Sequence, residues 1–290
     1  MLPSVKSGSL RFHFHLSCIV KTAIVTLQKA IINRIVPHPR VLNYAQKFRY
    51  LIFRGPFQKS FVEYYRRKSI TPNTALPPPS IFPDLNVERT LTELNENGYS
   101  IAFQLQQSHI EQLLETIISS GSDSIRELHK HCECFERIAR DYSVMSVARQ
   151  YLGVEPVIYA SSIYLTAPLA PVHKTSNKPM KTVHFDANDF RDLNLFIYLN
   201  DVDDDASPHY VFEGTHEKKT YRDLFTRWYT RDEITARFGP KIKSITGPAG
   251  LAFFEDTSAF HIQSRGKRAR YTMSVCFTLQ RSPNLARHNA

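Results

Sequence analysis

The second half of the chain is built from short apolar runs, and this pattern constrains the fold more than any other feature of the sequence. From Val157 onward the runs are separated by Pro, Gly, Asn and Asp. Short runs bounded by such turn formers are typical of antiparallel strands, because helices need longer periodic segments. The runs are VIYASSIYL, LNLFIYL, HYVF, LAFF and YTMSVCF. The pattern predicts an antiparallel barrel or jelly roll.

Helical patterns precede and interrupt these strands. Ser108 and Glu111 have the spacing of a capping box, for a helix that we expect to end near Gly121. A second helical pattern over residues 135–153 closes at a glycine, and Asp223–Phe238 reads as a charged helical insertion among the strands. The first helix should bury one apolar face, formed by Ile110, Leu113, Leu114, Ile117 and Ile118. We therefore expect a mostly β fold with flanking helices.

Positive charge is concentrated at the start of the sequence. Residues 1–70 hold 13 Lys and Arg against the single acid Glu63, whereas the remaining residues hold 24 against 26 acids. An uncharged, proline-rich stretch follows, which is typical of an extended connector. The sequence thus predicts a basic leader at 1–68, a connector at 69–83 and one folded domain at 84–290.

Part of this leader, Leu16–Val36, has the spacing of an amphipathic basic helix. Lysines and arginines interrupt it too often for a membrane-spanning segment. Three roles remain open: a helix packed on the folded domain, peripheral contact with an anionic membrane, or organelle targeting. No nucleic-acid-binding module accompanies the charge, so we expect no nucleic-acid partner.

The cysteines indicate a reducing compartment. Four of them, Cys18, Cys132, Cys134 and Cys276, are too few and too scattered to build a disulfide framework. We therefore expect a cytoplasmic protein, with peripheral membrane contact or organelle targeting as the roles of the leader that stay open.

The stretch VHFDAND, residues 183–189, places a histidine and an aspartate two residues apart. On a strand such residues point to the same face, so His184 and Asp186 can bind one metal ion together. Two imidazoles and one carboxylate form the facial triad of non-haem iron. His261 is the best candidate for the third ligand, because it lies just after the strand LAFFEDT, where a barrel would bring its rim back beside His184.

Two similar pairs lie in helical contexts, His109 with Glu111 and His131 with Glu133. Residues two apart on a helix point away from each other, so we expect neither pair to bind metal. The run His129–Cys134 holds further soft ligands, but it lacks the Cys-x2-Cys spacing and the second ligand pair of a zinc site.

An arginine near the last strand can bind a dicarboxylic acid. Arg270 opens the strand RYTMSVCF, and its guanidinium can form a bidentate pair with a carboxylate. Arg268 lies two residues earlier and would face the same way on an extended strand. We favour Arg270, because it directly adjoins the apolar run.

The order of these motifs resembles the phytanoyl-CoA dioxygenase family of Fe(II)/2-oxoglutarate oxygenases. The motifs are SVARQYLGVEPV, HFD, LNLFIYLNDVDDDASPHYVFEGTH, ITGPAGLAFFEDTSAFH and the following Arg270, and the resemblance covers roughly residues 90–280. It implies a double-stranded β-helix, or jelly roll, with His184, Asp186 and His261 on Fe(II) and Arg270 on 2-oxoglutarate. The segment SPHYVFEGTH departs from the family's turn at Ser207, where the family has Gly, and at Glu213, where it has Pro.

The resemblance also implies an activity. Family members use O2 and 2-oxoglutarate to hydroxylate small organic or acyl substrates, and they release succinate and CO2. Related halogenases lack the carboxylate ligand, so Asp186 favours hydroxylation or a related oxidation over halogenation. Strand placement further suggests Tyr164, Thr166 and Asn194 as polar contacts to 2-oxoglutarate, with no catalytic residue beyond the metal ligands.

Two questions stay open at the level of the sequence. The insertion Tyr221–Lys243, with Trp228 and Tyr229, is either a lid over the site or a surface helix that covers the sheet. A barrel that has kept its shape without turnover, acting as a binding module with a membrane-associating leader, is the alternative to an oxygenase.

Overall fold

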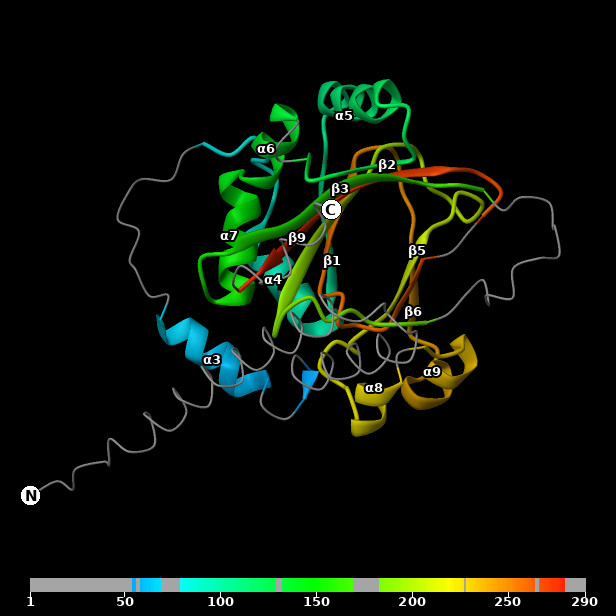
Figure 1. The fold of residues 1–290 in the computed structure, drawn as a ribbon. Helices are drawn as coiled ribbons and strands as arrows, with labels where there is room; N and C mark the ends of the chain where they lie inside the picture. Colours follow the sequence, from blue (N-terminus) through cyan, green and yellow to red (C-terminus); the bar gives the residue numbers. More distant parts are fainter. Residues whose placement is uncertain are drawn as a thin grey trace, which may run out of the picture.

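Two antiparallel sheets form the framework of the domain (Figure 1). The computed structural model describes residues 54–55, 58–68, 79–128, 132–168, 183–226, 228–263 and 266–279. In this part of the chain the larger sheet has six strands in the order β1-β7-β4-β9-β3-β2, and the smaller has three in the order β6-β5-β8. The expected mostly β fold with a jelly-roll core is confirmed.

The larger sheet contains most of the strands that the apolar runs predict. Its inner face is lined by alternate residues, because successive side chains on a strand point to opposite faces. The strands are β1 (Tyr99–Gln104), β2 (Ser124–Arg126), β3 (Val157–Thr166), β4 (Asp192–Tyr198), β7 (Leu251–Glu255) and β9 (Arg270–Thr278). Strand β9 pairs along its whole length with β3 on one side and over seven residues with β4 on the other.

The smaller sheet brings two distant parts of the sequence together. It consists of β5 (His209–Phe212), β6 (Ile242–Ile245) and β8 (His261–Gln263). Beyond β8, an isolated antiparallel bridge joins His184 to His261. The HFD motif therefore lies beside β8 as a short additional strand of this sheet.

Helices cover the side of the larger sheet that faces away from the smaller one (Figure 1). They are α4 (Val87–Asn97), α5 (Gln107–Ser119), α6 (Glu133–Ala139) and α7 (Tyr142–Leu152). Together with the sheet they bury the main core, which includes Leu94, Leu113, Phe135, Val147 and Phe277. Gly153 caps α7 in the left-handed region at φ 73°, as its sequence position predicted.

The predicted capping box of α5 is wrong. The helix begins at Gln107, its N-cap is Gln106, and no side chain caps it, so Ser108 lies inside the first turn. The predicted apolar face is correct at Ile110, Leu113 and Ile117, but Ile118 is 65% exposed. The sequence pattern located the helix but overestimated the width of its buried apolar face. That width depends on how the helix tilts against its neighbours.

Residues at the end of the predicted leader pack against the folded domain. Arg54 is buried, and helix α3 (Gln58–Lys68) places Val62 in the main core. Arg54 donates hydrogen bonds to the carbonyls of Asp189 and Phe190, and its Nη2 lies 2.5 Å from Asp192 Oδ1. These contacts anchor α3 beside the segment that leads into β4.

The charged insertion forms two helices, α8 (Tyr221–Phe225) and α9 (Arg231–Phe238), below the smaller sheet in Figure 1. Asp223 is buried and holds the insertion together, because it accepts two hydrogen bonds of 2.8 Å from Arg237 and one from the Tyr229 hydroxyl. Burial alone would raise the pKa of Asp223, but these hydrogen bonds outweigh it and lower the pKa.

Several sequence predictions lie outside the described residues. These are the amphipathic segment Leu16–Val36, most of the connector and residues 129–131, which include the histidine of the decoy pair His131 with Glu133. Among the described helices, none is long and apolar enough to cross a membrane.

Candidate metal centre

The two histidines of the predicted triad are brought together by backbone pairing. The His184 N–H donates to the His261 carbonyl at 3.0 Å, and the His261 N–H donates back to the His184 carbonyl at 2.8 Å. Residues that exchange both hydrogen bonds lie directly opposite each other, with side chains on the same face. The two imidazole rings accordingly lie with their centroids 4.3 Å apart.

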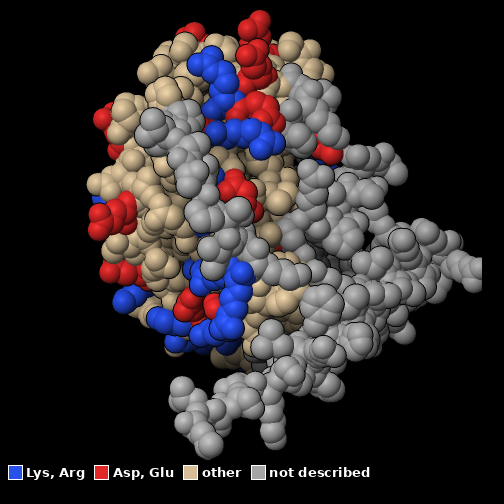
Figure 2. All heavy atoms as spheres, turned by 90° about the vertical axis from the view of Figure 1, so that its left-hand side faces the viewer, with Lys and Arg blue, Asp and Glu red and all other residues tan. Residues whose placement is uncertain are grey.

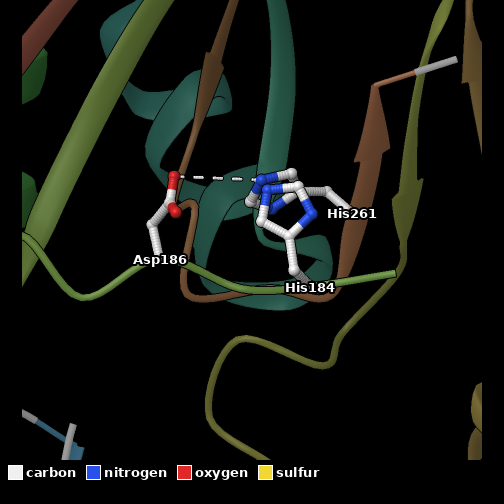
Figure 3. Close-up of side chains that lie close together, drawn as sticks. All are labelled: His184, Asp186 and His261. Carbon is white, nitrogen blue, oxygen red and sulfur yellow. Dashed lines mark ion pairs between the residues drawn. The ribbon is translucent and has the colours of Figure 1, made fainter. Parts of the chain in front are cut away.

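Asp186 completes the group from the same segment (Figure 3). Its backbone N–H donates to the Thr257 carbonyl at 2.7 Å, which fixes the position of the residue. One ligand atom from each of His184, Asp186 and His261 lies within 4.8 Å of the others, and the Asp186 Oδ2 is 3.9 Å from His261 Nε2. The alternation of the strand turns Phe185 the other way, into an apolar cluster with Phe260.

The orientation of His261 suits a metal ligand. Its Nδ1 lies 3.0 Å from the Ala259 carbonyl and can donate a hydrogen bond to it. This arrangement leaves Nε2, the atom that faces Asp186, with a free lone pair. The observed geometry thus fits two neutral imidazoles and one carboxylate aimed at a common point.

Beneath the triad lies a buried acid-histidine pair that the sequence analysis did not single out. Glu255 Oε1 is 3.6 Å from His261 Nδ1, and its Oε2 is 2.8 Å from His209 Nε2. Burial raises the pKa of Glu255 to about 8, and burial together with the charge of Arg270 lowers the pKa of His209 to about 3. Burial thus favours the neutral form of both groups.

A signal for Glu255 does exist in the sequence, since it is the first of two acids that directly follow the apolar run LAFF. His209 opens the run HYVF in the same way. Neither could be paired with the other from the sequence, because they meet only when β7 and β5 face each other across the barrel.

The structure separates the two candidate arginines. Arg270 is 1% exposed at the start of β9, and its guanidinium donates to the Ser207 carbonyl and lies 3.4 Å from Thr166 Oγ1. Arg268 lies in the turn before the strand and forms an ion pair with Asp203 in which both side chains are more than half exposed. The expectation that both face the same way is wrong, because the extended strand begins only at Arg270.

Arg270 has no acidic partner in the protein. Among the described residues, which include every Asp and Glu of the sequence, none forms an ion pair with it, and its Nε has no hydrogen-bond partner. A buried cation of this kind is unfavourable unless an anion completes its surroundings. The position therefore fits the carboxylate of a bound small molecule.

The backbone turn at Ser207, next to the Arg270 guanidinium, explains one departure from the pattern of the phytanoyl-CoA dioxygenase family. Ser207 is fully buried at φ 59°, in the left-handed region that favours glycine. Its carbonyl accepts from Arg270, and its hydroxyl accepts from the Gly266 N–H at 2.7 Å. The serine thus keeps the strained turn while it ties the turn to the loop before β9.

The three residues suggested as co-substrate contacts lie on the two strands that flank β9, but Asn194 is paired with Cys276, six residues along β9 from Arg270. Thr166 is paired directly with Arg270 across β3 and β9, and Tyr164 is paired with Thr272 two positions along, on the same face. Asn194 on β4 donates to Thr257 Oγ1 at 2.9 Å. Thr166 also accepts a hydrogen bond of 2.8 Å from Gln263.

The insertion contributes an aromatic residue to the rim of the site. The Val183 and Tyr229 backbones pair through two hydrogen bonds of 2.9 Å, which joins the insertion to the HFD segment. As a result the Trp228 ring lies 5.0 Å from the His184 ring, and Trp228 remains 52% exposed. A large apolar side chain that is half exposed beside a metal ligand is suited to contact a substrate.

Comparison with known proteins supports this picture of the fold. No family model matches the chain. The sequence is similar to L-proline trans-4-hydroxylase from Streptomyces griseoviridis, with 25% identity over 209 residues that cover 61% of this chain and 75% of that protein.

Solved structures share the architecture at low sequence identity. EctD from S. alaskensis with bound Fe gives a TM-score of 0.50 at 17% identity, covering 72% of this chain and 79% of EctD. The epimerase SnoN in complex with Fe3+, alpha ketoglutarate and nogalamycin RO gives 0.53 at 15% identity, covering 66% of this chain and 83% of SnoN. The fold of this chain is therefore one that holds iron and 2-oxoglutarate in other proteins.

Proposed function

We propose that this chain is an Fe(II)/2-oxoglutarate-dependent dioxygenase that hydroxylates a small organic or acyl substrate and releases succinate and CO2. The observation that carries the proposal is the combination of two features in one barrel. His184, Asp186 and His261 converge from two segments, and Arg270 is buried without an acidic partner. The first feature fits the metal, and the second fits the co-substrate.

The three converging side chains would hold the iron. Asp186 supplies the only anionic ligand, and the two histidines supply neutral nitrogens on the same side. Iron bound there would supply the activation of O2, which no protein side chain can provide. The protein holds the ligands in place through the paired backbones of His184 and His261 and through the Asp186 N–H bond to Thr257.

Arg270 would bind the distal carboxylate of 2-oxoglutarate. Its guanidinium is held by the Ser207 carbonyl and is close to the Thr166 hydroxyl, so its remaining donors are pre-oriented. A charge-assisted bidentate pair in a buried site is strong and directional. Thr166 and Tyr164 would add hydroxyl contacts from the neighbouring strand, and Asn194 would add an amide contact from β4.

The primary substrate would enter beside Trp228. This residue places an apolar, half-exposed ring next to His184 on the insertion, and the ion pair of Asp223 with Arg237 keeps the insertion folded. In this role the insertion is a lid that excludes water from the site. The resemblance to the phytanoyl-CoA dioxygenase family favours an acyl substrate, while the similarity to L-proline trans-4-hydroxylase favours a free amino acid.

Production of succinate from 2-oxoglutarate distinguishes this proposal from the non-catalytic alternative. The full-length protein is incubated with Fe(II), ascorbate and 2-oxoglutarate, and succinate is quantified with panels of free amino acids and of acyl thioesters. An oxygenase gives succinate above a metal-free control, and its substrate gives the largest increase. The Asp186→Ala variant is the matched control. A wild-type rate equal to both controls across the two panels would favour a binding module.

A further inference from the structure

A second, strongly basic cavity lies on the other side of the HFD segment from the triad. It measures about 810 Å³ and lies between α3, the turn before β4 and the segment that follows β5. Figure 2 views the molecule from the side of α3, where Lys and Arg side chains gather around a few acidic ones. The volume is in the range of small-molecule sites.

The charges that line this cavity are unbalanced. The lining cations are Arg54, Lys59, Arg66, Arg191 and Lys219, and the lining acids are Glu63, Glu217 and Asp256. Two of these charges are already matched, since Arg54 pairs with Asp192 and Glu63 pairs with Arg67. Arg66, Arg191 and Lys219 form no ion pair with any described residue.

No other part of the chain can neutralise these cations with an acidic side chain. All 27 Asp and Glu of the sequence lie within the described residues. The remaining segments, including residues 1–53, add only neutral and basic side chains. Glu217 and Asp256 offset only part of the positive charge, and apart from Glu63, which pairs with Arg67, no further Asp or Glu lines the cavity.

Two of these cations, Arg66 and Arg191, are held close enough to repel each other. Arg66 donates to the Tyr151 and Leu152 carbonyls at the end of α7, and the guanidinium of Arg191 lies 4.0 Å above the Tyr151 ring. Burial, and then the charge of Arg191, lower the pKa of Arg66. Like charges brought together in this way are typical of sites that bind an anion between them.

Lys219 closes the cavity from the side of the HFD segment. Its Nζ donates to the Thr215 carbonyl at 2.8 Å and lies 4.2 Å from the Phe260 ring centroid and 4.9 Å from that of Phe185. Burial, and then the charge of Arg54, lower the pKa of Lys219 to about 7. A bound anion would favour the charged ammonium and relieve this unfavourable environment.

We propose that this cavity is a binding site for a phosphate group, with Arg191, Arg66 and Lys219 as its ligands. Phosphate carries up to two negative charges and several acceptor oxygens, so it can bridge guanidinium and ammonium groups that a single carboxylate would leave unbalanced. The group is carried either by a small phosphorylated molecule or by a lipid headgroup. The site is independent of the proposed oxygenase activity, because none of its residues is a proposed ligand of iron or 2-oxoglutarate.

Isothermal titration calorimetry of the full-length protein with inorganic phosphate and pyrophosphate tests for a small phosphorylated ligand. Co-sedimentation with phosphatidylglycerol vesicles, compared with phosphatidylcholine vesicles, tests for a lipid headgroup. Arg191→Gln should weaken binding about tenfold or more, because it removes a charged donor. Arg140→Gln, at an exposed pair with Glu136 outside the cavity, is the matched control and should bind as the wild type does. His261→Ala should also bind phosphate normally, which separates this site from phosphate held by iron.

Lys59→Gln is a second test variant that is expected to fold normally, since Lys59 is an exposed residue of α3 that lines the cavity. It should keep the wild-type melting temperature and weaken binding by a smaller factor. Phosphate or pyrophosphate binding that is lost in Arg191→Gln and kept in Arg140→Gln supports a small-molecule ligand. Binding to phosphatidylglycerol vesicles without binding of phosphate or pyrophosphate supports a lipid headgroup, if vesicle binding is likewise lost in Arg191→Gln and kept in Arg140→Gln. Absence of binding in both arms, or binding that Arg191→Gln and Lys59→Gln leave unchanged, overturns the proposal.

Discussion

Replacement of Arg270 by leucine should weaken 2-oxoglutarate binding sharply without loss of iron. The side chain is 1% exposed and has no acidic partner, so a co-substrate carboxylate would be its only counter-charge. Truncation of one member of a buried, hydrogen-bonded charge pair costs about 2 to 5 kcal/mol of binding free energy. A central value of about 3 kcal/mol corresponds to a roughly 100-fold rise in the Kd for 2-oxoglutarate.

The assay measures the KM for 2-oxoglutarate by succinate release, alongside the iron content of each variant. Arg268→Leu is the matched control, because Arg268 forms only an exposed ion pair, and its KM should stay within about twofold of the wild type. Arg270→Lys keeps the charge but loses the planar fork, and it should fall between the two. If Arg268→Leu raised the KM more than Arg270→Leu, or if well-folded Arg270→Leu kept the wild-type KM, the assigned carboxylate contact would be wrong.

Three further predictions concern the triad, Trp228 and the charged insertion. The variants Asp186→Ala, His184→Ala and His261→Ala should each retain less than about a tenth of the wild-type iron content. The control His109→Ala, in a helical decoy pair, should retain the full iron content. An Asp186→Ala protein with the iron content of the wild type would show that the triad is not the metal site. Trp228→Ala should raise the KM for the primary substrate about tenfold and leave the KM for 2-oxoglutarate unchanged, since the exposed ring lies at the rim of the site beside His184. A parallel rise in both KM values would point to a general loss of structure. Asp223→Asn should lower the melting temperature at pH 7, but the difference should shrink as the pH falls below about 4. A carboxyl whose folded pKa is lowered contributes its full stabilisation above its unfolded pKa and loses it progressively as the pH falls towards its folded pKa. A difference in melting temperature that stays constant from about pH 7 to pH 3 would show that the charge of Asp223 is not what holds the insertion.

The sequence alone determined the class of the fold and the identity of the metal-ligand candidates. The short apolar runs are a local property, and their spacing placed β3, β4, β5, β7 and β9 close to where the structure has them. The HFD motif is equally local, because the two-residue period of a strand puts His184 and Asp186 on one face whatever surrounds them. His261 could be proposed from its place after an apolar run, although nothing local fixed its distance from His184.

Only the tertiary structure decided the relations between distant segments. The pairing of His184 with His261 and the meeting of Glu255 with His209 depend on how the two sheets close against each other. The choice between Arg268 and Arg270 depended on the residue at which β9 begins, and strand boundaries are the least reliable feature of a sequence pattern. The basic cavity was invisible in the sequence for the same reason. Its cations come from α3, the turn before β4 and the segment after β5, and their charges act on one another only once burial and proximity remove the water that screens them in the unfolded chain.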